Sequence, residues 1–102
     1  MSAHTPGPWT HSPHSGNDVV MGNGMEIAHV FDARFDRPMD ALDERRANAR
    51  LIAAAPDLLW LVERAKGLRD HTPKWTKAER DRSWAAWDER ARAVIATIRG
   101  GT

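Results

Sequence analysis

The sequence VVMGNGMEIAHVF, running from Val19 to Phe31, decides the N-terminal part of the fold. Apolar residues stand on both sides of Asn23-Gly24, and an Asn-Gly pair supplies the positive φ angles that a tight hairpin turn requires. We therefore predict two antiparallel strands, with a third short edge strand near Trp9–His11 in an N-terminal arm punctuated by proline and glycine. So small a sheet is unstable alone, and helices or another copy of the protein must cover one of its faces.

Two helical segments follow the hairpin and are predicted to form a kinked pair over residues 40–68. Asp40 or Asp43 can cap the first segment, because a short acidic side chain accepts hydrogen bonds from the free N–H groups at the start of a helix. Pro56 starts the second segment, since proline is favourable in the first turn of a helix and disruptive in its interior. The apolar stripe of the second segment ends near Gly67, where we expect the helix to stop.

The last segment, residues 76–99, is predicted to be an amphipathic helix rich in tryptophan. Thr76 with Glu79 three positions later forms a capping box at its start. Its apolar residues recur at helical spacing, at Trp84, Trp87, Ala91, Val94, Ile95 and Ile98. We expect this helix to pair with the preceding segment as an antiparallel hairpin lying on one face of the sheet, with Trp84 and Trp87 in the core.

Together these elements predict an α+β fold in a single domain spanning residues 1–102. A small N-terminal antiparallel sheet of two or three strands, within residues 1–36, would pack against C-terminal helices that form a helical hairpin. A domain of this length buries roughly 60–70% of the surface of its unfolded chain, so self-association would add useful stability. The unpaired sheet edge and the five tryptophans point the same way, and we expect a homodimer or a larger homo-oligomer.

The composition argues against several classes of protein. The chain has no cysteine, which excludes disulfides, thiolate catalysis and Cys-ligated metals. Its apolar stretches are too short to cross a bilayer and its N-terminus lacks a signal-peptide pattern, so we expect a cytoplasmic protein with no membrane contact. A net charge of +1 disfavours nucleic acid as a partner, and the basic residues of the last segment spread around the helix: Lys74, Lys77, Arg82, Arg90, Arg92 and Arg99.

No group of residues points to catalysis. His11 and His14 have a spacing that could place two imidazoles on one metal ion, but the irregular backbone around Pro13 does not fix the two rings together. Asp43 and Glu44 are adjacent in a helix and point about 100° apart, so they do not converge on one substrate atom. We therefore expect no catalytic residue, no metal site and no cofactor.

Exposed aromatic and cationic side chains are the candidates for binding a partner. Trp60 and Trp75 lie outside the apolar stripes, so we expect them to be exposed anchors. Arg80 falls on the same angular face as Trp84, where it either stacks on an indole at a contact surface or extends past it to solvent.

A polar strip on the first helix is the second candidate binding surface. Arg46, Asn48 and Arg50, beside Arg45, could grip a phosphate or a partner's carboxylates through paired guanidinium contacts. The alternative is a solvated face, balanced by the acidic residues one turn away.

Two motifs resemble those of a widespread group of small phage and prophage proteins. The first is TPGPW at Thr5–Trp9, and the second is ANARLIAAAPDLL at Ala47–Leu59. The resemblance extends to about Arg64, and the tryptophan-rich last helix lies outside it. It implies an accessory protein that acts inside the host cell of a phage.

What the resemblance implies most concretely is a non-enzymatic inhibitor of a bacterial defence system, anti-CRISPR-like or of another kind, that binds a host protein or defence complex. One alternative is an oligomeric sponge that sequesters a small nucleotide immune signal. A nucleic-acid-binding accessory protein is another, and steep weakening of binding with salt would identify it.

Overall fold

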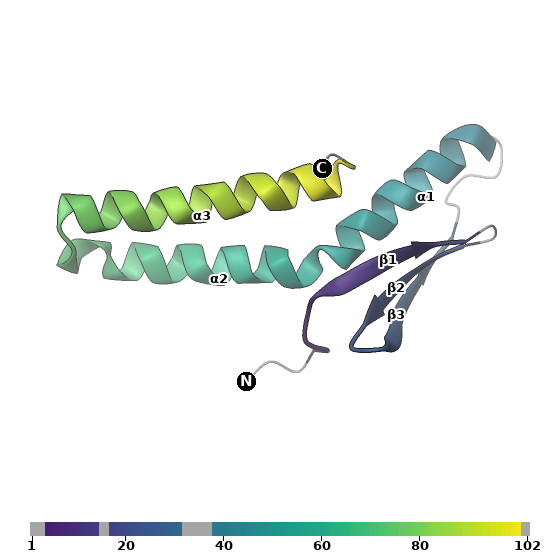
Figure 1. Cartoon of the computed structure of the whole chain (residues 1–102), viewed down its shortest axis with the longest axis horizontal. Helices are drawn as coiled ribbons and strands as arrows, with labels where there is room; N and C mark the ends of the chain where they lie inside the picture. The colour runs from purple at the N-terminus through teal and green to yellow at the C-terminus, as the bar shows by residue number, and fades with distance from the viewer. Residues whose placement is uncertain (1–3, 15–16, 32–37, 101–102) are drawn as a thin grey trace.

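The structure, a computed structural model, describes residues 4–14, 17–31 and 38–100 of the chain. Residues 32–37, between the predicted hairpin and the first helix, lie outside the described residues. The elements in chain order are β1 (Trp9–Pro13), β2 (Asp18–Gly22), β3 (Met25–Val30), α1 (Pro38–Ala53), α2 (Ala55–His71), the 3₁₀ turn η1 (Thr72–Lys74) and α3 (Lys77–Ile98) (Figure 1). The α+β fold is therefore as predicted.

The sheet has three antiparallel strands in the order β1-β2-β3. Asn23 and Gly24, with φ angles of 53° and 75°, make the turn between β2 and β3, as the Asn-Gly pair predicts. The register of these two strands shifts between Val20 and Met21, which marks a bulge. Both predicted strands and the predicted edge strand are present.

Helix α1 lies across the sheet and packs against all three strands (Figure 1). Val20, Val30 and Ala49 are buried between α1 and the sheet, and the indole of Trp9 packs against this cluster. Trp9 comes so close to β2 that a Cβ on Gly22 would lie 2.6 Å from its Cδ1 atom. A side chain at position 22 would therefore force the Trp9 ring to move.

The α2–α3 hairpin does not lie on the sheet, so that prediction was wrong. The two helices run antiparallel and project from the end of α1, giving a molecule of 55 × 28 × 20 Å (Figure 1). The hairpin leaves the sheet because the chain changes direction at Ala54, before the helical turn that contains Pro56. In addition, α1 already covers the face of the sheet. Within the described part of the chain, the end of the hairpin nearest α1 is the part that approaches β1.

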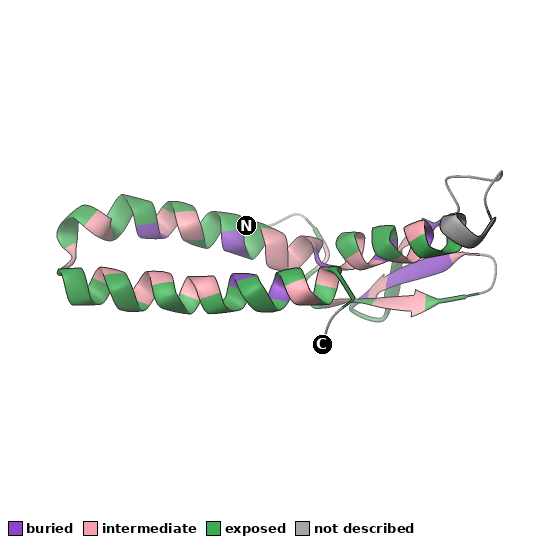
Figure 2. Ribbon diagram, turned by 90° about the horizontal axis from the view of Figure 1, so that it is seen from above, coloured by how far each residue is buried: buried purple, intermediate pink, exposed green. Residues whose placement is uncertain are grey.

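The hairpin has a hydrophobic core of its own along the facing sides of α2 and α3 (Figure 2). Leu61 and Val94 are buried in it, and Trp87 packs against it while its Nε1 donates a hydrogen bond to the Leu61 carbonyl oxygen at 2.8 Å. Trp84 is half-buried and stands edge-on to Trp87, with 5.7 Å between ring centroids. Of the two predicted core tryptophans, Trp87 reaches the core cluster, whereas Trp84 lies at its rim.

Two helix boundaries differ from the prediction. Helix α1 begins at Pro38, so Asp40 and Asp43 lie inside it; proline is well placed in a first turn because its missing N–H would have no partner there. Helix α2 begins at Ala55, with proline in its first turn as predicted, but runs through Gly67 to His71. One helical glycine costs only about 1 kcal/mol relative to alanine, which is too little to stop a helix that buries the next residue.

The start of α3 is as predicted. The Thr76 side chain accepts a hydrogen bond from the backbone N–H of Glu79 at 3.2 Å, and its hydroxyl donates to a Glu79 carboxylate oxygen at 3.1 Å. These contacts satisfy one of the free N–H groups at the helix start.

Candidate functional site

One side of the α2–α3 hairpin carries an exposed tryptophan ringed by arginines. We call it the Trp60 face and define it by the residues that line two adjoining hollows between the helices: Trp60, Arg64, Arg82, Ser83, Ala86, Trp87, Glu89, Arg90 and Ala93. Trp60 and Arg64 are one turn apart on α2, and Arg82, Ala86 and Arg90 follow one line along α3. The larger of the two hollows has a volume of about 470 Å³.

The side chains at the centre of this face are held in place by one another. The guanidinium carbon of Arg90 lies 5.1 Å from the centroid of the Trp60 ring, a cation–π contact. Arg90 also forms an ion pair with Asp57 at 3.4 Å. Trp60 nevertheless keeps 44% of its surface exposed. An indole fixed in place and open to solvent suits an anchor for a partner, because little conformational freedom is lost on binding.

The charge of the Trp60 face is positive. Arg64, Arg82 and Arg90 outnumber Glu89, and among the described residues neither Arg64 nor Arg82 forms an ion pair. A cationic surface with an aromatic centre suits an acidic partner that also offers an apolar group.

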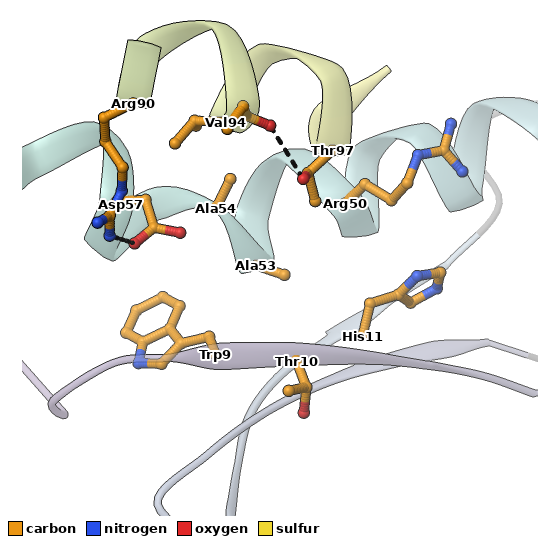
Figure 3. A pocket seen from close by; sticks show the side chains of 11 residues that line it. Trp9, Thr10, His11, Arg50, Ala53, Ala54, Asp57, Arg90, Val94 and Thr97 are labelled. Atoms are coloured by element: carbon orange, nitrogen blue, oxygen red, sulfur yellow. Dashed lines mark hydrogen bonds and ion pairs between the residues drawn. The ribbon is translucent and has the colours of Figure 1, made fainter. Parts of the chain in front are cut away.

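A third hollow, which we call the junction pocket, lies where the sheet, the α1–α2 break and the end of α3 meet (Figure 3). Its volume is about 460 Å³. It is lined by Trp9, Thr10 and His11 of β1, by Arg50, Ala53, Ala54 and Asp57 around the break, and by Arg90, Ala93, Val94 and Thr97 of α3.

The two motifs that carry the sequence resemblance meet at this junction. Trp9, from the first motif, faces Ala53 and Ala54, from the second, across the pocket (Figure 3). Gly7 abuts Pro56 so closely that a Cβ on the glycine would lie 2.9 Å from the Pro56 Cβ. The shared motifs therefore build the joint between the sheet and the hairpin.

A buried ionic cluster ties α1 to the sheet. Asp18 and Arg45 are 0% and 2% exposed, and Arg45 Nε donates to Asp18 Oδ1 at 3.1 Å while its Nη2 donates to the His14 carbonyl oxygen at 2.8 Å. His11 Nε2 is bonded to the other carboxylate oxygen of Asp18.

The ionic state of Asp18 is set by these neighbours. Burial of the carboxyl favours its neutral form, but the hydrogen bond and charge of His11 and the charge of Arg45 outweigh burial and lower the pKa of Asp18 below its ordinary value of 3.8. The cluster fixes the arrangement of β1, β2 and α1, and it positions His11 in the wall of the junction pocket.

The residues that the sequence suggested for binding do not come together. Trp60 lies at the centre of the Trp60 face, but Trp75 and Arg80 lie at the far tip of the hairpin, where both are half-buried. The Trp75 ring stands edge-on to His71, with 6.0 Å between ring centroids. The role of these residues in binding stays a prediction.

The polar strip on α1 divides between structural and exposed residues. Arg50 Nε donates to the carbonyl oxygen of Ile98 at 3.0 Å, which caps the C-terminal end of α3 and ties it to α1. Arg46 is half-buried and Asn48 is exposed. Arg50 therefore has a structural role and does not simply belong to a solvated polar face.

Sequence reasoning missed the arginines around Trp60 and the buried cluster. The spacing of Arg82, Ala86 and Arg90, four residues apart, marks one line on α3 and could have been recognised. Asp18 and Arg45 are 27 residues apart, and no local pattern brings them together.

No helix among the described residues is long and apolar enough to span a membrane, and these residues contain no cluster of three or more potential metal ligands. A family model described as Salmonella phage P22 protein Y8K6 matches residues 1–102. No curated protein and no solved structure matches the chain.

Proposed function

This chain belongs to the family of Salmonella phage P22 protein Y8K6, and we propose that it is a phage accessory protein that acts by binding a host protein and not by catalysis. The Trp60 face would be the contact surface and an acidic patch the feature recognised. The observation that supports this best is the Trp60–Arg90 contact: an indole held by a cation, 44% exposed, on a hairpin that projects away from the rest of the fold.

The most concrete version of this proposal is an inhibitor of a bacterial defence system, anti-CRISPR-like or of another kind. A small protein inhibits a larger complex by covering a functional surface, and a slender two-helix projection reaches into a groove that a globular domain would not enter. The arginines of the Trp60 face would complement acidic side chains on the surface of such a complex. The family membership supports a phage setting, while the step to host defence is an analogy.

The test is affinity capture of host proteins by the purified protein, followed by mass spectrometry and by direct binding measurements with the protein identified. Trp60→Ala should weaken binding of that partner by about 2 kcal/mol or more, because truncating a central aromatic anchor removes most of its contact area. Met25→Ala is the matched control, since Met25 is 62% exposed and lies on the sheet, away from the hairpin. Equal binding by wild-type protein and Trp60→Ala would exclude the Trp60 face.

The surrounding charges and the other predicted anchor need variants of their own. Arg82→Glu should weaken binding to an acidic partner and reduce its dependence on salt, because it reverses a charge at the rim of the hollow. Trp75→Ala tests whether the tip of the hairpin also contributes. Unchanged binding by Arg82→Glu would show that the surface recognised on the partner is not acidic.

A small nucleotide is the second candidate ligand, supported by the larger hollow of the Trp60 face. Trp60 offers an aromatic surface for stacking a base, and Arg64 and Arg82 line the same hollow of about 470 Å³ with guanidinium groups for phosphate. Mass spectrometry of small molecules released from the captured complexes distinguishes this sponge-like activity from protein binding. Binding that falls by orders of magnitude between low and physiological salt would instead indicate nucleic acid.

We also propose that the protein binds a second copy of itself. Away from the Trp60 face, Val62 is 68% exposed and lines a hollow with the half-buried Trp84, and Ile95 further along α3 is 45% exposed. Burying these residues against a second copy would remove apolar surface from water. Light scattering coupled to size exclusion tests this, and a monomer at tens of micromolar concentration would contradict it.

A further inference from the structure

The junction pocket has the composition of a small-molecule site. Its central walls are apolar: the small side chains of Ala53 and Ala54 on one side, Val94 on another and the Trp9 indole opposite (Figure 3). Its volume of about 460 Å³ lies within the range of about 300–1,000 Å³ that is usual for ligand pockets. Such pockets combine an apolar lining with a few polar groups that orient the ligand, and this one has polar groups at both ends.

The walls of the pocket are held rigidly. The Nε1 of Trp9 donates to the Thr5 carbonyl oxygen at 3.0 Å, so the indole is fixed with its ring forming a wall. His11 is held by the buried Asp18 carboxylate. Arg50 is held by its hydrogen bond to the Ile98 carbonyl oxygen at 3.0 Å. Fixed walls lower the entropic cost of binding, because few side chains need to be ordered by the ligand.

The charges around the pocket favour an anion. Arg50 and His11 lie toward one end, and Arg90 paired with Asp57 lies toward the other (Figure 3). Two arginines against one aspartate give the pocket lining a net positive charge, and Arg50 has guanidinium donors beyond the Nε that donates to the Ile98 carbonyl oxygen. The apolar centre between Trp9 and Val94 suits a flat hydrocarbon ring.

We propose that the junction pocket binds a small planar aromatic anion, with its ring between Trp9 and the α1–α2 break and its acidic group at the end formed by Arg50 and His11. Apart from Arg90 and Ala93, the residues that line this pocket do not belong to the Trp60 face. The proposal does not depend on the function proposed above. A ligand here would contact β1, the α1–α2 break and α3 together, and it would stiffen the joint between the sheet and the hairpin.

The experiment uses two probes with the same ring system. 8-Anilinonaphthalene-1-sulfonate carries one sulfonate, and N-phenyl-1-naphthylamine lacks it; both become fluorescent in apolar sites. We expect the sulfonate to bind with one molecule per chain, and the uncharged probe to bind at least about tenfold more weakly, which corresponds to the loss of one charge-assisted contact. Equal affinity for the two probes would overturn the anion assignment.

Variants locate the probe. Thr97→Leu should weaken binding of the sulfonate at least about tenfold, because Thr97 is an exposed residue that lines only this pocket and leucine adds volume there. Ala85→Leu, at an exposed position of α3 that lines none of the hollows, is the matched control. Arg64→Ala should also leave binding unchanged, because Arg64 lines the Trp60 face but not this pocket, and this separates the two sites.

Nuclear magnetic resonance gives an independent readout. The chain has five tryptophans, so each indole N–H gives its own signal, and the signal of Trp9 should move most on addition of the sulfonate. Unchanged affinity in Thr97→Leu, or the largest shift at a tryptophan other than Trp9, would overturn the proposal.

Discussion

Replacement of the buried Asp18 by asparagine should strongly destabilise the fold. The carboxylate is fully buried, accepts a hydrogen bond from Arg45 Nε at 3.1 Å and is bonded to His11. Asparagine keeps the shape but removes the negative charge from beside a guanidinium that is only 2% exposed. Removing one partner of a buried ion pair typically costs about 3–5 kcal/mol.

That cost is large for so small a protein. Domains are stable by about 5–15 kcal/mol in total, so the variant would lose a substantial share of its stability. For a domain of this size each kcal/mol lowers the melting temperature by about 4–8 °C, and we expect a fall of about 12 °C or more. Urea titrations followed by circular dichroism at 222 nm give the free energy directly, with an unchanged slope showing that the extent of unfolding is the same.

Asp70→Asn is the control, because it removes a carboxylate that is exposed to solvent. Asp70 pairs with Lys66 on the surface of α2, where the side chains are 47% and 70% exposed. Water and salt screen a pair of this kind, so this variant should melt close to wild type. A loss of less than about 1 kcal/mol in Asp18→Asn would refute the reasoning, because it would mean that the buried carboxylate contributes no more than an exposed one.

Other changes test separate parts of the structure. Gly67→Ala should raise stability by about 0.5–1 kcal/mol, because a Cβ there meets nothing within 4 Å inside α2; a loss in urea denaturation would show that the helix ends there. Gly22→Ala should cost about 1–3 kcal/mol by displacing the Trp9 ring, and an unchanged melt would contradict that close approach. Trp87→Ala should cost about 3–5 kcal/mol in the same assay, since it opens the hairpin core. Because the pKa of Asp18 is lowered in the folded state, its contribution is complete above its ordinary pKa of 3.8 and is lost as pH falls through the folded value. Wild type should therefore lose more stability than Asp18→Asn between about pH 4 and pH 2. Parallel curves of unfolding free energy against pH for the two proteins would argue against a lowered pKa of Asp18.

Elements with local causes could be predicted from the sequence. The turn at Asn23-Gly24 depends on the φ preferences of two adjacent residues, and the start of α3 depends on Thr76 and Glu79 within one turn. The break before Pro56 likewise follows from the missing N–H and fixed φ of a single residue. Each of these signals acts over at most a few residues.

Features that depend on distant residues could not be predicted. The sequence shows apolar stripes on the second and last helical segments but does not say which helix faces the sheet, and α1 rather than the hairpin covers it. The pair of Asp18 and Arg45 joins residues 27 positions apart. Trp60 was recognised as a candidate anchor because it leaves the stripe of α2, whereas its contact with Arg90 depends on how two helices are aligned.

The separation of the two hydrophobic clusters has a consequence for how the protein opens. One cluster, with Val20 and Ala49, holds α1 on the sheet, and the other, with Leu61 and Val94, holds α2 against α3. Amide hydrogen exchange should therefore resolve two cooperative opening units, with different protection in β2 and in the middle of α3. A partner bound to the Trp60 face would slow exchange in the hairpin and leave the sheet nearly unaffected, whereas a ligand in the junction pocket would slow exchange in both units at once.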